Sequence, residues 1–325
     1  MAKNVLVTGG SGRLGNYVCT HLKKQGYNVS SFDTVPSPPE SQNVAEKIPF
    51  VMGNLLDLGD CLRAIAFAQA DVIVHLAAIT GPTELGTPYT KDGVALPVNP
   101  FRSMQRMPED TCMKVNTMGT FFIMDAARRM NIKDMVISSS YYATGIGGRW
   151  SGTTYAPQYL PVDEDHPCDP ESTYALSKYL NEETAKAFCR AYGMNMIALR
   201  YMGVFYQDNE MSKRLYKFGI NVDPADDTNK GKMVDNTYQY VDARDIANIT
   251  DLSIQKIGKL PNPFEAFFVS TDTTYLEPSS EVVAKRWPAF TELGKNMKGT
   301  EGVFSIAKAE KLLGYKPAFS WRDQK

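Results

Sequence analysis

The chain has 325 residues, of which 43% are hydrophobic and 22% are charged, and these values are typical of soluble globular proteins. This length exceeds the size at which one hydrophobic core stops growing, so it predicts one large domain and a smaller one. The net charge of −1 and the pI near 6.3 create no field that would favour nucleic acid or acidic membranes. Neither is expected as a partner.

Targeting signals and disulfides are not expected either. The apolar part of the N-terminus spans only residues 5–7, and no stretch approaches the ~20 apolar residues of a membrane span. The five cysteines are odd in number, widely spaced and without a C-x-x-C pair. This usage is typical of thiols in a reducing compartment rather than of disulfides or zinc ligands, so a cytoplasmic protein without a metal site is predicted.

Short apolar or β-branched runs alternate with longer helical patterns over the first 200 residues. Strands are predicted at residues 4–8, 28–33, 48–52, 72–76, 134–138 and 195–200. Helices are predicted at residues 12–25, 57–68, 110–130 and 172–192. This alternation of apolar strands with helices predicts an α/β fold with a doubly wound parallel sheet of the Rossmann type.

Three long irregular segments interrupt the alternation, at residues 79–108, 141–170 and 201–237. Each follows the carboxyl end of a strand, where doubly wound sheets bind ligands, so each is predicted to line a substrate pocket. Exposed surface loops are the alternative. After residue 237 the sequence predicts one more strand, a helix and a strand, followed by a small C-terminal subdomain.

A glycine-rich turn supplies the first chemical signal. Gly9, Gly12 and Gly15 follow a predicted strand and open a predicted helix in the sequence VLVTGGSGRLG. The first glycine permits a tight turn, the second lets the backbone approach a pyrophosphate, and the third lets the helix pack on the strand. The N–H groups at the start of the helix would then bind the phosphates of a dinucleotide.

The end of the second strand indicates which dinucleotide is bound. Asp33 would accept hydrogen bonds from the adenosine ribose and repel a 2′-phosphate, so NAD is predicted in preference to NADP. Arg13 in the turn leaves room for NADP. The predicted domains are an NAD-binding domain of residues 1–200 plus 238–271 and a substrate-binding subdomain of residues 201–237 plus 272–325.

A second signal lies in the sequence ESTYALSK. Tyr174 and Lys178 are four residues apart near the start of a predicted helix, hence on one face. A phenol with a pKa near 10 is a poor base at neutral pH, but a nearby ammonium and a positive nicotinamide ring would favour the phenolate. The predicted strand before it ends in three serines, residues 138–140, which lie at the same edge of the sheet. A serine hydroxyl there could hydrogen-bond a substrate oxygen.

Together these features resemble the extended short-chain dehydrogenase/reductase superfamily, and within it the NAD-dependent epimerase/dehydratase group. The resemblance covers nearly the whole chain and rests on a series of short motifs in order. They are T-G-G-S-G-R-L-G at 8–15, G-N-L-L-D at 53–57, H-L-A-A at 75–78, V-N-T-M-G-T at 115–120, S-S-S at 138–140, Y-A-L-S-K at 174–178, L-R-Y at 199–201, Y-V-D-A-R-D at 240–245 and L-G-Y-K-P at 313–317.

The resemblance implies roles for particular residues. Tyr174 is the expected general acid/base, Lys178 its electrostatic partner and a ribose ligand, Ser140 the catalytic serine, and Asn116 an asparagine that supports the lysine through backbone and water. The expected cofactor-binding residues are Gly9, Gly12, Arg13, Leu14, Gly15, Asp33, Asn54, Leu55, Ala77, Ala78, Ser138, Tyr174, Lys178 and Tyr201. Helices 110–130 and 172–192 are expected to form the four-helix interface of a homodimer.

Two departures from the family pattern narrow the expected chemistry. Tyr141 and Tyr142 occupy the positions of the Asp-Glu pair of sugar-nucleotide dehydratases, so dehydration is not expected. Asn236 occupies the position of an arginine that grips the diphosphate of nucleotide sugars, and Arg244 follows the strand instead. Other cations that could take this role lie in the third segment, namely Lys213, Arg214, Lys230 and Lys232.

The expected function is therefore NAD-dependent oxidation or epimerisation at a carbinol carbon of a sugar-like or other hydroxylated small molecule. Tyr174 takes the hydroxyl proton while the hydride passes to the nicotinamide. A dehydrogenase releases the oxidised product, and an epimerase returns the hydride to the other face. A nucleotide-sugar 4-epimerase is the closest alternative, and a non-catalytic NAD(P)-binding regulatory protein is a third.

Overall fold

The computed structural model describes residues 2–81, 108, 110–146, 149, 156–208, 213 and 237–323. Within these residues, a seven-stranded sheet has the order β3-β2-β1-β4-β5-β6-β9, and all its pairs are parallel. Its strands are β1 Asn4–Thr8, β2 Asn28–Asp33, β3 Phe50–Met52, β4 Val72–His75, β5 Asp134–Ser140, β6 Asn195–Tyr201 and β9 Phe264–Val269. The predicted doubly wound α/β fold is confirmed.

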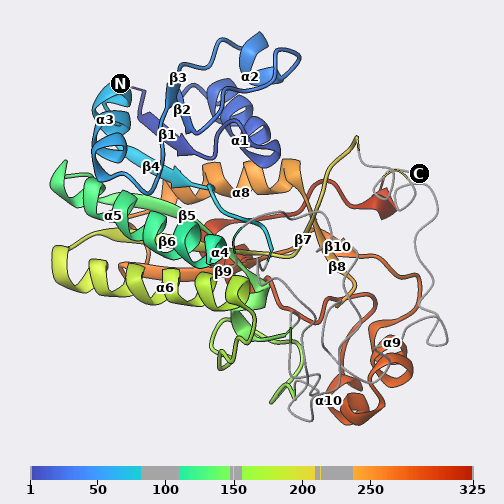
Figure 1. Ribbon diagram of the computed structural model, residues 1–325. Helices are drawn as coiled ribbons and strands as arrows, with labels where there is room; N and C mark the ends of the chain where they lie inside the picture. The colour runs from blue at the N-terminus through green and yellow to red at the C-terminus, as the bar shows by residue number, and fades with distance from the viewer. Residues whose placement is uncertain are drawn as a thin grey trace.

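Helices cover both faces of this sheet (Figure 1). On one face lie α3 Leu58–Ala68, α5 Gly119–Arg129 and α6 Thr173–Tyr192, and on the other lie α1 Arg13–Lys24 and α8 Ala243–Lys256. Each face has its own core of buried aliphatic and aromatic side chains, because near-continuously apolar strands expose apolar groups to both layers. The order reverses between β1 and β4, so the strands' carboxyl ends there form the crevice where such sheets bind ligands.

The predicted helix at residues 110–130 differs in detail from the observed one. It comprises α4 Thr111–Met113, a π-helical turn η2 at Lys114–Met118, and α5. Such single π turns inside helices are frequent at functional sites. The turn contains Asn116, one of the predicted site residues.

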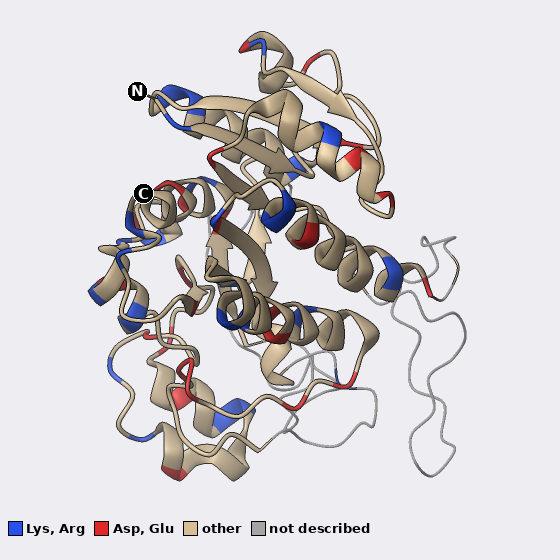
Figure 2. Ribbon diagram, turned by 90° about the vertical axis from the view of Figure 1, so that its left-hand side faces the viewer, with Lys and Arg blue, Asp and Glu red and all other residues tan. Residues whose placement is uncertain are grey.

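Further short elements complete the described chain. They are α2 Gln42–Ala45, the 3₁₀ turn η3 Tyr141–Thr144, α9 Ser279–Arg286, the 3₁₀ turn η4 Pro288–Phe290, α10 Thr291–Gly294, α11 Ala307–Leu313 and the 3₁₀ turn η5 Trp321–Asp323. No described helix is both long enough and apolar enough to cross a membrane. Figure 2 shows Lys and Arg mixed with Asp and Glu over the helices in view, in keeping with the small net charge.

A second, smaller sheet lies beyond the carboxyl end of β6. Strand β8 Gln239–Asp242 pairs in parallel with β7 Gly203–Phe205 and antiparallel with β10 Asp272–Thr273. The sequence predicted β8 but not β7, which is short and starts within the third irregular segment. The domain boundaries drawn from the sequence remain a prediction.

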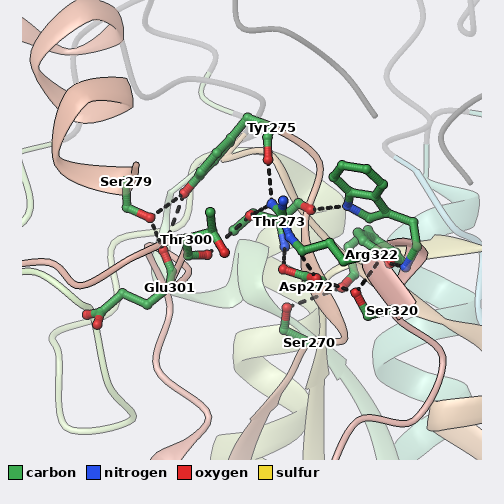
Figure 3. Close-up of polar contacts among 11 residues, drawn as sticks. Ser270, Asp272, Thr273, Tyr275, Ser279, Thr300, Glu301, Ser320 and Arg322 are labelled. Carbon is green, nitrogen blue, oxygen red and sulfur yellow. Dashed lines mark hydrogen bonds and ion pairs between the residues drawn. The ribbon is translucent and has the colours of Figure 1, made fainter. Parts of the chain in front are cut away.

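The C-terminal end of the described chain is hydrogen-bonded to this small sheet (Figure 3). The Arg322 guanidinium points toward β10, where its Nε donates to Asp272 Oδ2 at 3.1 Å and its Nη2 donates to Thr273 Oγ1 at 3.0 Å. The buried Trp321 indole donates from Nε1 to the carbonyl of Thr273 at 2.7 Å. Because both contacts reach β10, the tail stabilises the small sheet beside the ligand crevice.

Candidate functional site

A cavity of about 810 Å³ lies at the carboxyl ends of the central strands. It is lined by fifteen of the residues predicted for cofactor binding and catalysis. These are Gly9, Gly12, Arg13, Leu14, Gly15, Asp33, Asn54, Leu55, Ala77, Ala78, Ser138, Ser140, Tyr174, Lys178 and Tyr201. Of the predicted set, Asn116 alone does not line this cavity.

The glycine-rich turn joins β1 to α1 as the sequence predicted. Gly9 has φ +70°, a conformation that favours glycine, and a Cβ there would lie 2.7 Å from the Ala77 backbone. A Cβ on Gly15 would lie 2.2 Å from the Gly9 carbonyl oxygen. Gly12 is the N-cap of α1 and has no side chain that could cap the helix. The backbone N–H groups at the start of α1 are therefore available to a ligand in the cavity.

Asp33 ends β2 beside this turn. Its Oδ2 accepts from the Ser11 backbone N–H at 3.2 Å, and its Oδ1 accepts from the Thr34 backbone N–H at 2.8 Å. The Ser11 hydroxyl is buried and has no hydrogen-bond partner among the residues that the structure describes. A narrow glycine cradle, an uncapped helix start and a carboxylate at the next strand end together fit a dinucleotide with a free ribose 2′-hydroxyl.

The turn after β3 forms another part of the cavity wall. Asn54 Oδ1 accepts from the Leu56 backbone N–H at 2.9 Å, which stabilises a tight turn that presents Leu55 to the cavity. Ala77 and Ala78 follow β4, and small side chains here leave room beneath a bound ligand. These four residues line the cavity, and their contacts with a cofactor remain a prediction.

Arg13 contacts a segment that sequence reasoning missed. Its guanidinium stacks over the Tyr206 ring at 4.2 Å and pairs with Asp208 at 2.5 Å. Both partners follow β7, and Tyr206 also lines the cavity. No motif could have indicated this contact, since the two segments lie far apart in the sequence. In the structure, Arg13 joins the glycine turn to the start of the third irregular segment.

The predicted Ser-Tyr-Lys set meets at the end of β5. Ser172 caps α6 by accepting from the Ala175 backbone N–H at 3.2 Å, which places Tyr174 and Lys178 in the first turns of the helix. The Lys178 ammonium donates to the carbonyl oxygen of Ser138 at 3.0 Å and to its hydroxyl at 3.1 Å. The same ammonium lies 5.8 Å from the centre of the Tyr174 ring.

Burial shifts the pKa values of this set. It raises the pKa of Tyr174 above its ordinary value, while a hydrogen bond with the Ser140 side chain opposes the shift. It lowers the pKa of Lys178 to about 8, against the influence of Cys112 and Glu182. Lys178 therefore stays charged at neutral pH, and the Tyr174 phenol stays neutral until a further positive charge arrives.

Asn116 does not line the cavity, but its side chain is hydrogen-bonded to two segments that do. Its Oδ1 accepts from the Ile79 backbone N–H at 2.7 Å, and its Nδ2 donates to the Ile79 carbonyl at 3.0 Å. Nδ2 also donates to the Ser177 hydroxyl at 3.1 Å, which in turn donates to the carbonyl of Tyr174 at 2.8 Å. The side chain thus joins the loop after β4 to the start of α6. Its predicted support of Lys178 through backbone and water remains a prediction.

His75, in the H-L-A-A motif, is buried and held by two hydroxyl groups. Its ring is buried between the hydroxyls of Thr8, at 2.6 Å, and Thr120, at 2.9 Å. Burial lowers the pKa of His75 to about 3, so the ring is neutral at physiological pH. In the described part of the chain, no group of three or more His, Cys, Asp or Glu residues is arranged to hold a metal ion.

The structure describes some of the residues at which the sequence departs from the family pattern. Tyr142 lines the cavity with its ring 6.2 Å from that of Tyr174, so an aromatic ring stands where dehydratases carry an acid. Arg244 makes two contacts with the Asp242 carboxylate, at 2.8 and 2.9 Å, and stacks on Phe319 at 3.8 Å. Of the other cations considered for the diphosphate, Arg214, Lys230 and Lys232 lie outside the described residues, as does Asn236.

Comparison with curated proteins points to one enzyme family. The putative UDP-glucose 4-epimerase of Methanocaldococcus jannaschii is 32% identical over 201 residues, or 62% of this chain and 56% of that protein. The UDP-glucose 4-epimerase of Rhizobium meliloti is 25% identical over 343 residues, covering 97% of this chain and 93% of that protein. The human UDP-glucose 4-epimerase is 28% identical over 215 residues. The chain therefore spans only 56% of the length of the archaeal protein and 53% of the length of the human one.

Solved structures show the same fold. The UDP-glucose 4-epimerase from Brucella ovis in complex with NAD superposes with a TM-score of 0.66 at 19% identity, covering 98% of this chain and 94% of that one. The enzyme from Thermotoga maritima with UDP-glucose superposes with a TM-score of 0.65 at 20% identity, covering 99% and 96%.

The family is established by a match along most of the chain. Residues 5–89 and 99–265 match the model of the NAD dependent epimerase/dehydratase family. This match includes the glycine turn, Asp33 and the Ser-Tyr-Lys set, so the family predicted from the motifs is confirmed. The chain belongs to the NAD-dependent epimerase/dehydratase family.

Proposed function

We propose that this chain is an NAD-dependent oxidoreductase or epimerase that acts at a carbinol carbon of a carbohydrate-like molecule. The observation that carries the proposal is the meeting of Ser140, Tyr174 and Lys178 at one wall of a cavity whose other wall is the glycine turn. A hydroxylated substrate carbon can therefore lie between a proton acceptor and a dinucleotide.

The chain's own groups suit proton transfer. Tyr174 would take the proton of the substrate hydroxyl, and Ser140 would hold the same oxygen as negative charge develops on it. Lys178 would favour the phenolate through its charge while its ammonium stays fixed on Ser138. When bound, NAD supplies the hydride acceptor and a second positive charge close to the phenol.

NAD is preferred to NADP because each carboxylate oxygen of Asp33 accepts from one backbone N–H and can accept from a ribose hydroxyl with its remaining lone pairs. Relatives of the same fold were solved with NAD, which supports this choice.

Epimerisation of a nucleotide sugar is the second candidate. Relatives include UDP-glucose 4-epimerases, and one structural neighbour was solved with UDP-glucose. Against it, the engagement of Arg244 with Asp242 and Phe319 removes one cation that could bind a diphosphate.

The decisive experiment is to denature the purified protein and identify any released nicotinamide cofactor by mass and absorbance. Near-stoichiometric NAD supports an epimerase, which must keep its hydride carrier between half-reactions. An empty protein that binds added NAD reversibly supports a dehydrogenase. In parallel, the protein is incubated with UDP-galactose, and appearance of UDP-glucose identifies the second candidate. A protein that binds neither NAD nor NADP would contradict the proposal.

The pH dependence of stability tests the environment of Lys178. Its pKa of about 8 in the folded protein lies below the ordinary 10.5, so the unfolded chain binds more protons between these values. Stability should therefore rise by about 2–4 kcal/mol from pH 8 to pH 10.5, as the cost of burying the charge disappears. The measurement is urea unfolding of the wild type minus that of Lys178→Met, which cancels other titrations. A difference that stays flat or falls over this range would refute the assigned burial.

A homodimer and a cytoplasmic location are also proposed. Large apolar side chains lie exposed on the outer helices, with Met118 45%, Phe121 40% and Tyr192 44% accessible. The five cysteines, all in described residues, form no disulfide with one another, as is usual in a reducing compartment.

Light scattering should show that Phe121→Asp dissociates a dimer, while the matched Phe67→Asp on α3, exposed by 57%, leaves it intact. A wild type that runs as a monomer would rule the dimer out.

A further inference from the structure

The glycine turn is held from behind by side chains that the family motifs do not include. Asn43, on the short helix α2, is only 3% exposed and does not line the cavity. Its Nδ2 donates to the carbonyl oxygen of Gly10 at 2.8 Å and to the Ser37 hydroxyl at 3.2 Å. A polar side chain buried so fully against the turn is there for its hydrogen bonds, because burial without them would be costly.

A second asparagine extends this contact along the turn. Asn16, in the first turns of α1, donates from Nδ2 to the carbonyl of Ser11 at 3.2 Å and to that of Gly12 at 3.0 Å. Its Oδ1 accepts from the backbone N–H of Asn43 at 3.3 Å, which joins the Asn16 side chain to the backbone of Asn43, so the two residues form one brace behind the turn. Three consecutive carbonyls of the turn therefore accept side-chain amide N–H groups.

The orientation of these carbonyls fixes that of the N–H groups. In a trans peptide unit the C=O of one residue and the N–H of the next point in opposite directions. With the Gly12 carbonyl held by Asn16, the Arg13 N–H in the same unit points away from the brace. That N–H is one of the unpaired donors at the start of α1, and Gly12, Arg13 and Leu14 line the cavity.

We propose that Asn43, acting with Asn16, is a positioning residue that holds the turn in the conformation that binds the pyrophosphate, without touching the cofactor itself. The inference rests on the proposed NAD site and adds to it a dependence of affinity on the segment between β2 and β3. Loss of the Asn43 contact would let the Gly10 carbonyl rotate toward the cavity, whereas the Gly12 carbonyl also accepts from the Asn16 backbone N–H at 3.0 Å and stays in the helix. The negative end of the Gly10 carbonyl would then face the phosphates.

The test compares Asn43→Ala with Gln42→Ala, a matched loss of an amide from the exposed neighbouring residue on α2. Binding of NAD, ADP-ribose and adenosine to the full chain is measured by calorimetry. We expect Asn43→Ala to weaken NAD and ADP-ribose about tenfold, while adenosine, which has no pyrophosphate, changes less than about twofold. Gln42→Ala should behave as wild type. At saturating NAD, kcat should be unchanged, so the defect appears in the KM for NAD.

Two outcomes overturn the inference. Unchanged NAD affinity in Asn43→Ala shows that the brace is dispensable, and equal weakening of all three ligands shows a general structural role instead. If Asn43→Ala does not fold, Asn16→Ala, on a half-buried position, is tested for the same pyrophosphate signature and decides in its place. A wild type that binds none of the nucleotides contradicts the proposed function rather than the brace.

Discussion

Replacing Tyr174 by phenylalanine is expected to lower kcat about 10²- to 10⁴-fold, because the substitution removes the group that accepts the substrate proton. The phenyl ring keeps the packing of the tyrosine, and its neighbours Tyr142 and Lys178 are unchanged. NAD binding should therefore stay within about threefold of wild type, since the glycine turn, Asp33 and Lys178 are unchanged. The measurement is the rate of hydride transfer at saturating NAD, followed by absorbance.

The matched control is Tyr142→Phe. It removes a hydroxyl from a second tyrosine that lines the same cavity, with its ring 6.2 Å from that of Tyr174. If proton transfer belongs to Tyr174, this variant should lose less than about tenfold in kcat. Equal losses in both variants would mean that the proton acceptor has been assigned wrongly. A Tyr174→Phe variant that kept full biological activity would revive the non-catalytic reading.

The parts of the site that could be predicted are those whose chemistry is local in the sequence. Gly9 needs a positive φ, and Gly15 needs the absence of a Cβ, so both requirements are visible in a few residues between a strand and a helix. Tyr174 and Lys178 share a helix face by spacing alone. The parallel strands then bring the glycine turn and Ser140 to one edge, as a parallel sheet must.

The parts that could not be predicted depend on contacts between distant segments. Asn116 is hydrogen-bonded to Ile79, which lies 37 residues earlier in the sequence. Arg13 stacks on Tyr206, which lies in a distant part of the sequence. Each contact needs a particular side-chain direction in the folded protein, which neither propensity nor periodicity encodes. The π turn at 114–118 and the short strand β7 were missed for the same reason, since tertiary packing rather than local preference stabilises them.

The buried ion pair of α6 should have the largest effect on stability. Glu182 accepts from Arg200 Nε at 2.9 Å and Nη2 at 2.8 Å, and from the Ser139 hydroxyl at 2.6 Å. The side chains of the ion pair are only 1% and 5% exposed. Glu182→Leu leaves the Arg200 charge buried without its partner, so we expect a loss of about 3–5 kcal/mol in the free energy of unfolding. Urea denaturation of the purified protein measures it.

The adjacent residue supplies the control. Glu183 pairs with Lys186 at 2.6 Å on the surface of the same helix, so Glu183→Leu should cost less than about 1 kcal/mol. The double variant Glu182→Leu/Arg200→Met removes both buried charges and should recover most of the loss. If the double variant stays as unstable as the single variant, packing rather than charge explains the loss of stability.

Because Glu182 lies one turn after Lys178 and is hydrogen-bonded to Ser139 on β5, the single variant Glu182→Leu should also loosen the Lys178–Ser138 contact. A lower kcat of the folded protein at low temperature, restored in the double variant, would show that this ion pair aligns the catalytic helix with the strand that carries Ser140.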